Sequence, residues 1–237
     1  MNFFYKFGTI TLALVLAVVS LHAQNVDEVI DKYINALGGK QKLKALRSIK
    51  IVGELHNQGV VLEMTTNILN GVGIRTDITV PDMGNGFQII TPTKGWSFMS
   101  FSGPKNPQAL SAEQVSAGQP GIDLQGALFN YKQKGNQVAL VGKEMVDSLN
   151  CYKIKITYKF GRVMYYFIDD QQFHRVKLLT TETVNGVATE LVTLYSDFRR
   201  TPEGYLFPFA QSSKNGTMQV NVVTINPTIK TSIFQPK

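Results

Sequence analysis

The most constraining feature of this chain is the dipeptide Asn-Gly, which occurs four times among β-branched, aromatic or alternating residues. Asn-Gly is the strongest short signal for a β-hairpin, because a type I′ turn requires positive φ at both central residues. Its repetition predicts a large antiparallel meander, in which strands that follow one another in sequence pair in space. The four dipeptides are Asn70-Gly71, Asn85-Gly86, Asn185-Gly186 and Asn215-Gly216.

The N-terminal residues 1–23 are typical of a secretory signal peptide. Lys6 precedes an apolar run over 7–19, and Ser20-Leu-His-Ala23 then provides a small-residue cleavage site. The apolar run is shorter than the roughly 20 residues that a membrane-spanning helix needs. A retained N-terminal anchor stays open as the alternative. No cysteine follows the run, so we expect a mature protein that begins at Gln24, lies in the periplasm and carries no lipid anchor.

Residues 24–237 have a length that suits one β domain, and we predict a single domain. The formal net charge of the whole chain is +7 at pH 7, which is compatible with an anionic membrane surface or with good solubility. Nucleic acid is disfavoured as a partner, because no dense run of Lys and Arg carries interleaved aromatic residues. Cys151 is the single cysteine. Its place at the start of an alternating strand predicts a buried, inert thiol.

Residues 25–46 are predicted to form two helices. Asn25 and Glu28 have the spacing of a capping pair, and Gly38-Gly39 is a natural stop. The second helix runs from Lys40 to about Leu46, and its basic residues form either a solvated face or a docking patch for an anionic partner. The apolar stripe of the first helix comprises Val26, Val29, Ile30, Tyr33, Ile34 and Leu37.

From Ser48 onward, apolar and polar residues alternate with a period of two, which is typical of strands with one buried face and one face in water. About 10–12 strands are predicted, and an open twisted sheet of that size tends to curl. The expected fold is mainly β with some α: an incomplete, half-open antiparallel β-barrel whose concave face is covered by helices.

The alternation stops over residues 102–136, a stretch too long and too apolar for a hairpin loop. A short helix is predicted to begin at Ser111, with Gln114 at its third position, and a second one to cover about 123–131. We predict that 102–136 is a lid lying across the sheet.

No motif in the sequence indicates catalysis. Only His56 and His174 remain after signal removal, and no spacing of His, Cys or Glu resembles a zinc site. Neither a nucleophile elbow nor a phosphate-binding loop is present. We therefore expect no catalytic residue, no metal and no cofactor, although a hydrolase with dispersed catalytic residues stays open as an alternative.

The aromatic residues exceed what one face of a simple sheet needs, which suits an apolar ligand cavity with few polar groups. An ordinary filled core is the alternative, and it would fit a structural or protein-interaction module of the cell envelope. The candidate cavity residues are Trp96, Phe98, Phe101, Phe129 and Tyr165.

The order of these segments resembles the periplasmic lipoprotein carrier superfamily LolA/LolB, in particular its branch of outer-membrane lipoprotein-sorting-like proteins. The likeness covers almost all of the mature chain, and its short motifs are specific through their order. They are 26–39 (VDEVIDKYINALGG), 95–98 (GWSF), 142–147 (GKEMVD), 152–156 (YKIKI), 168–169 (ID), 195–199 (YSDFR), 206–208 (LFP) and 215–216 (NG), followed by the Asn226-Pro227 and Ile233-Phe234 pairs.

This resemblance implies a non-enzymatic, monomeric carrier that holds lipid or lipoprotein acyl chains on the concave face of the half-barrel. A transient contact with a membrane or an envelope protein would accompany such transport. In the family, an Arg on an early strand contacts the lid helices and helps to gate the cavity. Arg75, in the sequence Gly73-Ile-Arg-Thr-Asp77, lies at the comparable place, so the resemblance implies a gating role for it.

Overall fold

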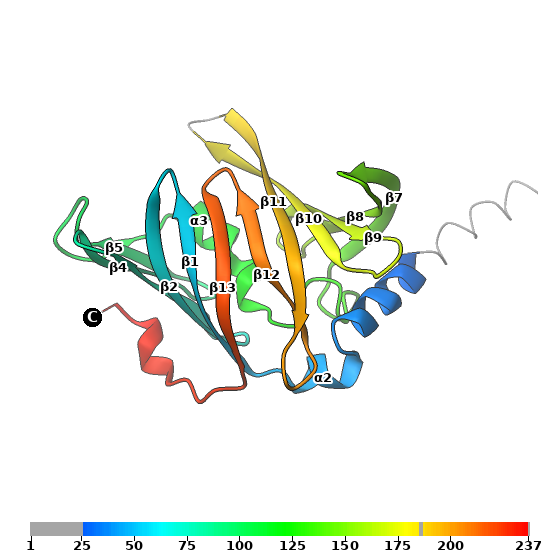
Figure 1. The fold of residues 1–237 in the computed structure, drawn as a ribbon, viewed down its shortest axis with the longest axis horizontal. Helices are drawn as coiled ribbons and strands as arrows, with labels where there is room; N and C mark the ends of the chain where they lie inside the picture. The colour runs from blue at the N-terminus through cyan, green and yellow to red at the C-terminus, as the bar shows by residue number, and fades with distance from the viewer. Residues whose placement is uncertain (1–25, 185–186, 237) are drawn as a thin grey trace, which may run out of the picture.

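The protein is built on one open antiparallel sheet of thirteen strands, as seen in a computed structural model that describes residues 26–184 and 187–236. The strand order across the sheet is β6-β5-β4-β3-β2-β1-β13-β12-β11-β10-β9-β8-β7 (Figure 1). Two meanders, β1 to β6 and β7 to β13, are joined where β1 pairs with β13. The predicted mainly β, half-open architecture is confirmed, with thirteen strands in place of the expected 10–12.

The strands of the first meander are β1 Ser48–Asn57, β2 Val60–Leu69, β3 Gly73–Val80, β4 Gly84–Ile90, β5 Gly95–Met99 and β6 Gln108–Ala109. The strands of the second are β7 Gln137–Val146, β8 Leu149–Thr157, β9 Val163–Asp169, β10 Arg175–Val184, β11 Val187–Arg200, β12 Leu206–Ser213 and β13 Gly216–Ile225.

Both predicted N-terminal helices are present. The first covers residues 26–36, and α2 covers Lys40–Ala45. Val29, Ile30 and Ile34 are 2–3% exposed, so the apolar stripe of the first helix is its buried face. The Gly38-Gly39 pair has positive φ at both residues and separates the two helices. The basic residues of α2 are exposed, and Asn25 of the expected cap lies outside the described residues.

Residues 102–136 contain only one of the two predicted helices. Helix α3, Ala112–Gly118, begins at Ser111, which forms the expected reciprocal cap with Gln114. The 3-10 turn η1, Gln119–Ile122, follows directly. The prediction of a second helix over 123–131 is wrong, because these residues form turns. Gly126 (φ 78°) and Asn130 (φ 50°) have left-handed backbones, which interrupt a right-handed helix.

The sheet has two faces that are packed by different elements. We call one the inner face; it carries Ile49, Ile68 and Ile74 in the first meander and Ile154 and Tyr166 in the second. The helix over 26–36, α2, α3 and η1 lie against this face, and the sheet curves around α3 (Figure 1). The opposite, outer face is covered near β3 to β5 by the C-terminal 3-10 turn η2, Thr231–Phe234.

The Asn-Gly dipeptides mark two of the described hairpins. Asn70-Gly71 lies in the three-residue connection from β2 to β3, and Asn215-Gly216 joins β12 to β13. Neither asparagine has positive φ, so neither turn is of the predicted I′ type.

The prediction of a turn at Asn85-Gly86 is wrong, because both residues lie inside β4. A Cβ at position 86 would lie 2.4 Å from the Phe98 carbonyl oxygen of β5, so glycine there permits close approach within the sheet. Asn185-Gly186 lies outside the described residues, between β10 and β11, whose flanking residues Val184 and Val187 pair.

Within residues 26–184 and 187–236, no helix is long and apolar enough to cross a membrane. Cys151 is 0% exposed, and burial raises the pKa of its thiol to about 11, which agrees with the predicted inert cysteine. The predicted signal peptide, residues 1–23, lies outside the described part of the chain.

Candidate functional site

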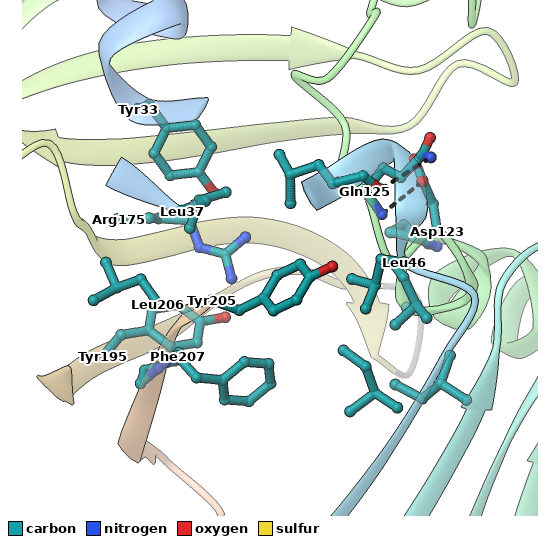
Figure 2. Close-up of a pocket in the computed structure, with 18 of the residues that line it drawn as sticks. Tyr33, Leu37, Leu46, Asp123, Gln125, Arg175, Tyr195, Tyr205, Leu206 and Phe207 are labelled. Carbon is teal, nitrogen blue, oxygen red and sulfur yellow. Dashed lines mark hydrogen bonds between the residues drawn. The ribbon is translucent and has the colours of Figure 1, made fainter. Parts of the chain in front are cut away.

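A cavity of about 360 Å³ lies between the helical elements and the inner face of the sheet (Figure 2). Its walls come from the helix over 26–36, from α2, from the stretch 120–126 and from strands on both sides of the β1–β13 seam. Most of the lining is apolar, including Leu37, Leu43, Leu46, Ile49, Ile68 and Ile225. The volume falls at the lower end of the roughly 300–1,000 Å³ that is typical of small-molecule sites.

The helical wall of the cavity is fixed to the sheet by backbone contacts. The Leu206 N–H donates to the Leu37 carbonyl oxygen at 3.2 Å, just past the end of the first helix. The Tyr205 hydroxyl donates to the Lys42 carbonyl oxygen at 2.8 Å and so holds α2 beside β12. Leu43 and Leu46 are 4% and 3% exposed, and their burial keeps this wall apolar.

The opposite wall is the stretch 119–126, which we call the roof. Several hydrogen bonds connect it to the rest of the fold, including those from the Leu124 N–H to Asn70 Oδ1 (3.0 Å), from the Gly71 N–H to the Ile122 carbonyl oxygen (3.1 Å) and from Gln125 Nε2 to the Leu43 carbonyl oxygen (3.2 Å). Gln119 Nε2 also donates to the Pro92 carbonyl oxygen (2.9 Å), and Lys134 Nζ donates to Asp123 Oδ2 (2.6 Å) and to the Gly126 carbonyl oxygen (2.9 Å). Each such bond contributes about 1 kcal/mol net. These bonds and the buried side chain of Ile122 attach the roof to the connection between β2 and β3, to α2 and to Lys134.

One cationic side chain, Arg175, points into this otherwise apolar space (Figure 2). Its guanidinium carbon lies 4.6 Å from the ring centroid of Tyr166 and 4.5 Å from that of Tyr195. The Tyr33 hydroxyl points toward it from the first helix. Burial disfavours the charged form of Arg175, but the surrounding tyrosines hold its pKa above the ordinary value, so the side chain stays charged.

The charge of Arg175 has no anionic partner among the residues whose side chains are described. Burial raises the pKa of Tyr33 to about 12 and also raises that of Tyr195, so both remain neutral at physiological pH. Asp123 lines the same cavity but pairs with Lys134 at 2.6 Å. Arg175 is partly buried, and its cation–π contacts with Tyr166 and Tyr195 stabilise the guanidinium but supply no counter-charge.

Three of the residues predicted to form the site lie together on the outer face of β3 to β5. Trp96 and Phe98 pack with Phe87 and Phe234, on the side that η2 covers. Arg75 lies on the same side. Its Nε and Nη2 contact Asp77 Oδ1 at 2.8 and 2.7 Å, and Nη1 donates to the Ile233 carbonyl oxygen at 3.1 Å. These partners tie Arg75 to η2 and to its own strand, whereas its neighbour Ile74 faces η1.

The other three predicted residues are dispersed. Phe129 is buried with the first helix in the inner core, and Tyr165 packs with Cys151 on the outer face. Phe101 is partly exposed beyond the end of β5. None of the six predicted residues is among the described residues that line the cavity. The ligand-binding and gating roles assigned to them stay predictions.

Arg175 is not among the site residues that the sequence predicts. Arg175 and Lys177 are two residues apart, so regular alternation would place them on one face. A register shift between them places Arg175 beside Tyr166 on the inner face and Lys177 beside Phe167 on the outer face. No residue pattern in the sequence signals this bulge.

Comparison with known proteins identifies the fold and little else. No protein-family model and no curated protein matches the chain. Among solved structures, a LolA superfamily protein from Nitrosomonas europaea matches with a TM-score of 0.55 and 15% identity, over 85% of this chain and 96% of that one. A DUF1329 family protein from Desulfovibrio piger matches with a TM-score of 0.54 and 11% identity, over 89% of this chain and 97% of the other.

An outer membrane lipoprotein-sorting protein domain from Vibrio parahaemolyticus is a third similar structure, with a TM-score of 0.50 and 12% identity, over 82% of this chain and 93% of that domain. The LolA-like fold that the sequence motifs predict is therefore confirmed. Among the described residues, no group of three or more His, Cys, Asp or Glu side chains could hold a metal ion.

Proposed function

We propose that this protein is a periplasmic carrier that binds the acyl chains of a lipid or lipoprotein in the cavity on the inner face. The observation that carries the proposal is the apolar cavity enclosed between the helices and the sheet. Each CH₂ group transferred from water into such a space contributes about 0.8 kcal/mol. The LolA-like fold supports the same conclusion by analogy.

The inner face beyond the cavity supports this proposal. Strand register places Leu55, Met64, Ile78, Met99 and Met218 on the same face as Ile49, toward the β1–β2 turn. All five are partly exposed. Methionine side chains are flexible and adapt to apolar partners of different shapes. A chain longer than the cavity can therefore continue along this strip of the sheet.

The proposal is tested by native mass spectrometry of protein purified without detergent, followed by titration of the delipidated protein with a fluorescent fatty acid. We expect co-purified lipid in the first experiment and saturable binding in the second. A lipid-free mass together with no binding would reject the carrier and favour an interaction module with a filled core.

A substitution that fills the cavity should abolish binding. Leu124 lines the cavity from the roof and is partly buried, so Leu124→Trp places an indole in the space that the ligand needs. We expect at least about a tenfold weaker affinity for the fatty acid, with the fold retained by circular dichroism. Val222→Trp is the matched control, because Val222 is 52% exposed on the other face of β13. Equal losses in the two variants would place the ligand elsewhere.

Loosening the roof should accelerate release of the ligand. Asn70→Ala removes the acceptor of the Leu124 N–H bond, which is worth about 1 kcal/mol. If opening of the roof limits release, the dissociation rate of a bound acyl probe should rise about fivefold. Asn106→Ala, at an exposed site elsewhere in 102–136, is the control. Unchanged rates in stopped-flow displacement would show that the ligand leaves by another route.

A further inference from the structure

We propose that Arg175 binds the carboxylate of a single-chain fatty acid, so that the carried ligand is an anionic amphiphile whose head group lies inside the cavity and whose chain covers the apolar walls. This inference rests on the proposed carrier function and specifies its ligand class. A carboxylate site differs from binding through the acyl chain alone, because it predicts that the protein discriminates between lipids that have the same acyl chain and different head groups.

The position of Arg175 in the cavity supports this proposal. Its guanidinium lies among the residues that line the cavity (Figure 2). The ring centroids of Tyr166 and Tyr195 lie 4.6 and 4.5 Å from its guanidinium carbon, and these contacts position the side chain without neutralising its charge. Among the described residues, the one carboxylate that lines this cavity is Asp123, which pairs with Lys134. The described lining therefore offers Arg175 no carboxylate of its own, and an anionic group of a ligand would pair with it.

The chemistry of the neighbouring side chains suits a carboxylate. A single guanidinium presents two parallel N–H groups, which match the two oxygens of one carboxylate. The Tyr33 hydroxyl, which points toward the guanidinium, can donate one more hydrogen bond to the same group. A diacyl phospholipid would bring two chains, and a cavity of about 360 Å³ favours one chain.

The test compares cis-parinaric acid with its methyl ester on delipidated wild-type protein and on Arg175→Met, Arg175→Lys and Arg199→Met. We expect the wild type to bind the acid at least about tenfold more tightly than the ester. Arg175→Met should remove this preference by weakening binding of the acid and leaving the ester unchanged. Arg175→Lys should retain part of the preference, because it keeps the charge but not the paired donors. Arg199→Met, at an exposed arginine, should behave as wild type.

The outcomes distinguish failure of the carrier function from failure of the carboxylate site. Binding of neither probe by the wild type would reject the carrier function itself. Equal binding of acid and ester by the wild type, unaltered in Arg175→Met, would keep the carrier and overturn the carboxylate site. Acetate in large excess should fail to displace the acid, because the chain supplies most of the affinity; displacement would indicate a site for free anions and also overturn the proposal.

The melting temperature of the ligand-free variant gives an independent reading. Arg175→Met removes a charge that has no carboxylate partner among the described residues, so the apo variant should melt close to the wild-type temperature. A lower melting temperature of the apo variant together with an unchanged preference for the acid would show that Arg175 supports the fold only, and would reject its role as a ligand-binding residue.

Discussion

Gly53→Ala should lower the free energy of unfolding by about 3 kcal/mol, the upper end of the usual cost of overpacking, because position 53 lies in the seam that joins the two meanders. A Cβ there would lie 2.1 Å from the carbonyl oxygen of Gln219 and 3.0 Å from the Cα of Val220. Both are backbone atoms of β13, which cannot rotate away as a side chain can. Gly53 also sits beside the register shift between β1 and β13, so local movement would disturb their pairing.

Urea denaturation of the variant and of Gly121→Ala as a control measures this effect. Gly121 lies in the roof, where a Cβ would meet only the Ile74 side chain at 3.7 Å, an ordinary contact. Alanine there should leave stability unchanged or raise it slightly. Similar stabilities of the two variants would mean that β1 and β13 are not packed as described, and that the two meanders are joined in another way.

The sequence is most informative where a regular period persists. The stripe of the first helix and the alternation of strands such as β8 predict elements whose buried residues the structure confirms, including Ile30 and Ile154. The prediction of a turn is wrong where an Asn-Gly pair is required by tertiary packing and not by a turn. Asn85-Gly86 has the composition of a turn, but close approach of β5 requires its glycine inside a strand.

The candidate site is harder to predict than the fold for a physical reason. Alternation shows which residues share a face of a strand, but not which other element covers that face. Trp96 and Phe98 do share a face, but η2, more than one hundred residues later in the chain, covers it. The inward direction of Arg175 depends on a bulge that leaves no residue pattern.

Phe167→Ala should cost about 3–5 kcal/mol, the range for removing a fully buried phenylalanine ring. Phe167 is 0% exposed on the outer face of β9, between Cys151 and Val176. The ammonium groups of Lys177 and Lys153 lie 4.3 and 5.3 Å from its ring centroid, so the substitution removes these contacts as well. For a domain of this size, the melting temperature should fall by about 10 °C.

Phe160→Ala provides the matched control, because Phe160 is 40% exposed and its removal should cost about 1 kcal/mol or less. Phe167 lies on the face away from the cavity, so its replacement should leave the stoichiometry of fatty-acid binding unchanged below the melting temperature. Arg175→Met should do the opposite, with binding impaired and stability retained. If Phe167→Ala instead abolished binding in a protein that is still folded, the two faces of the sheet would be coupled, and the inner-face cavity alone would not explain ligand binding.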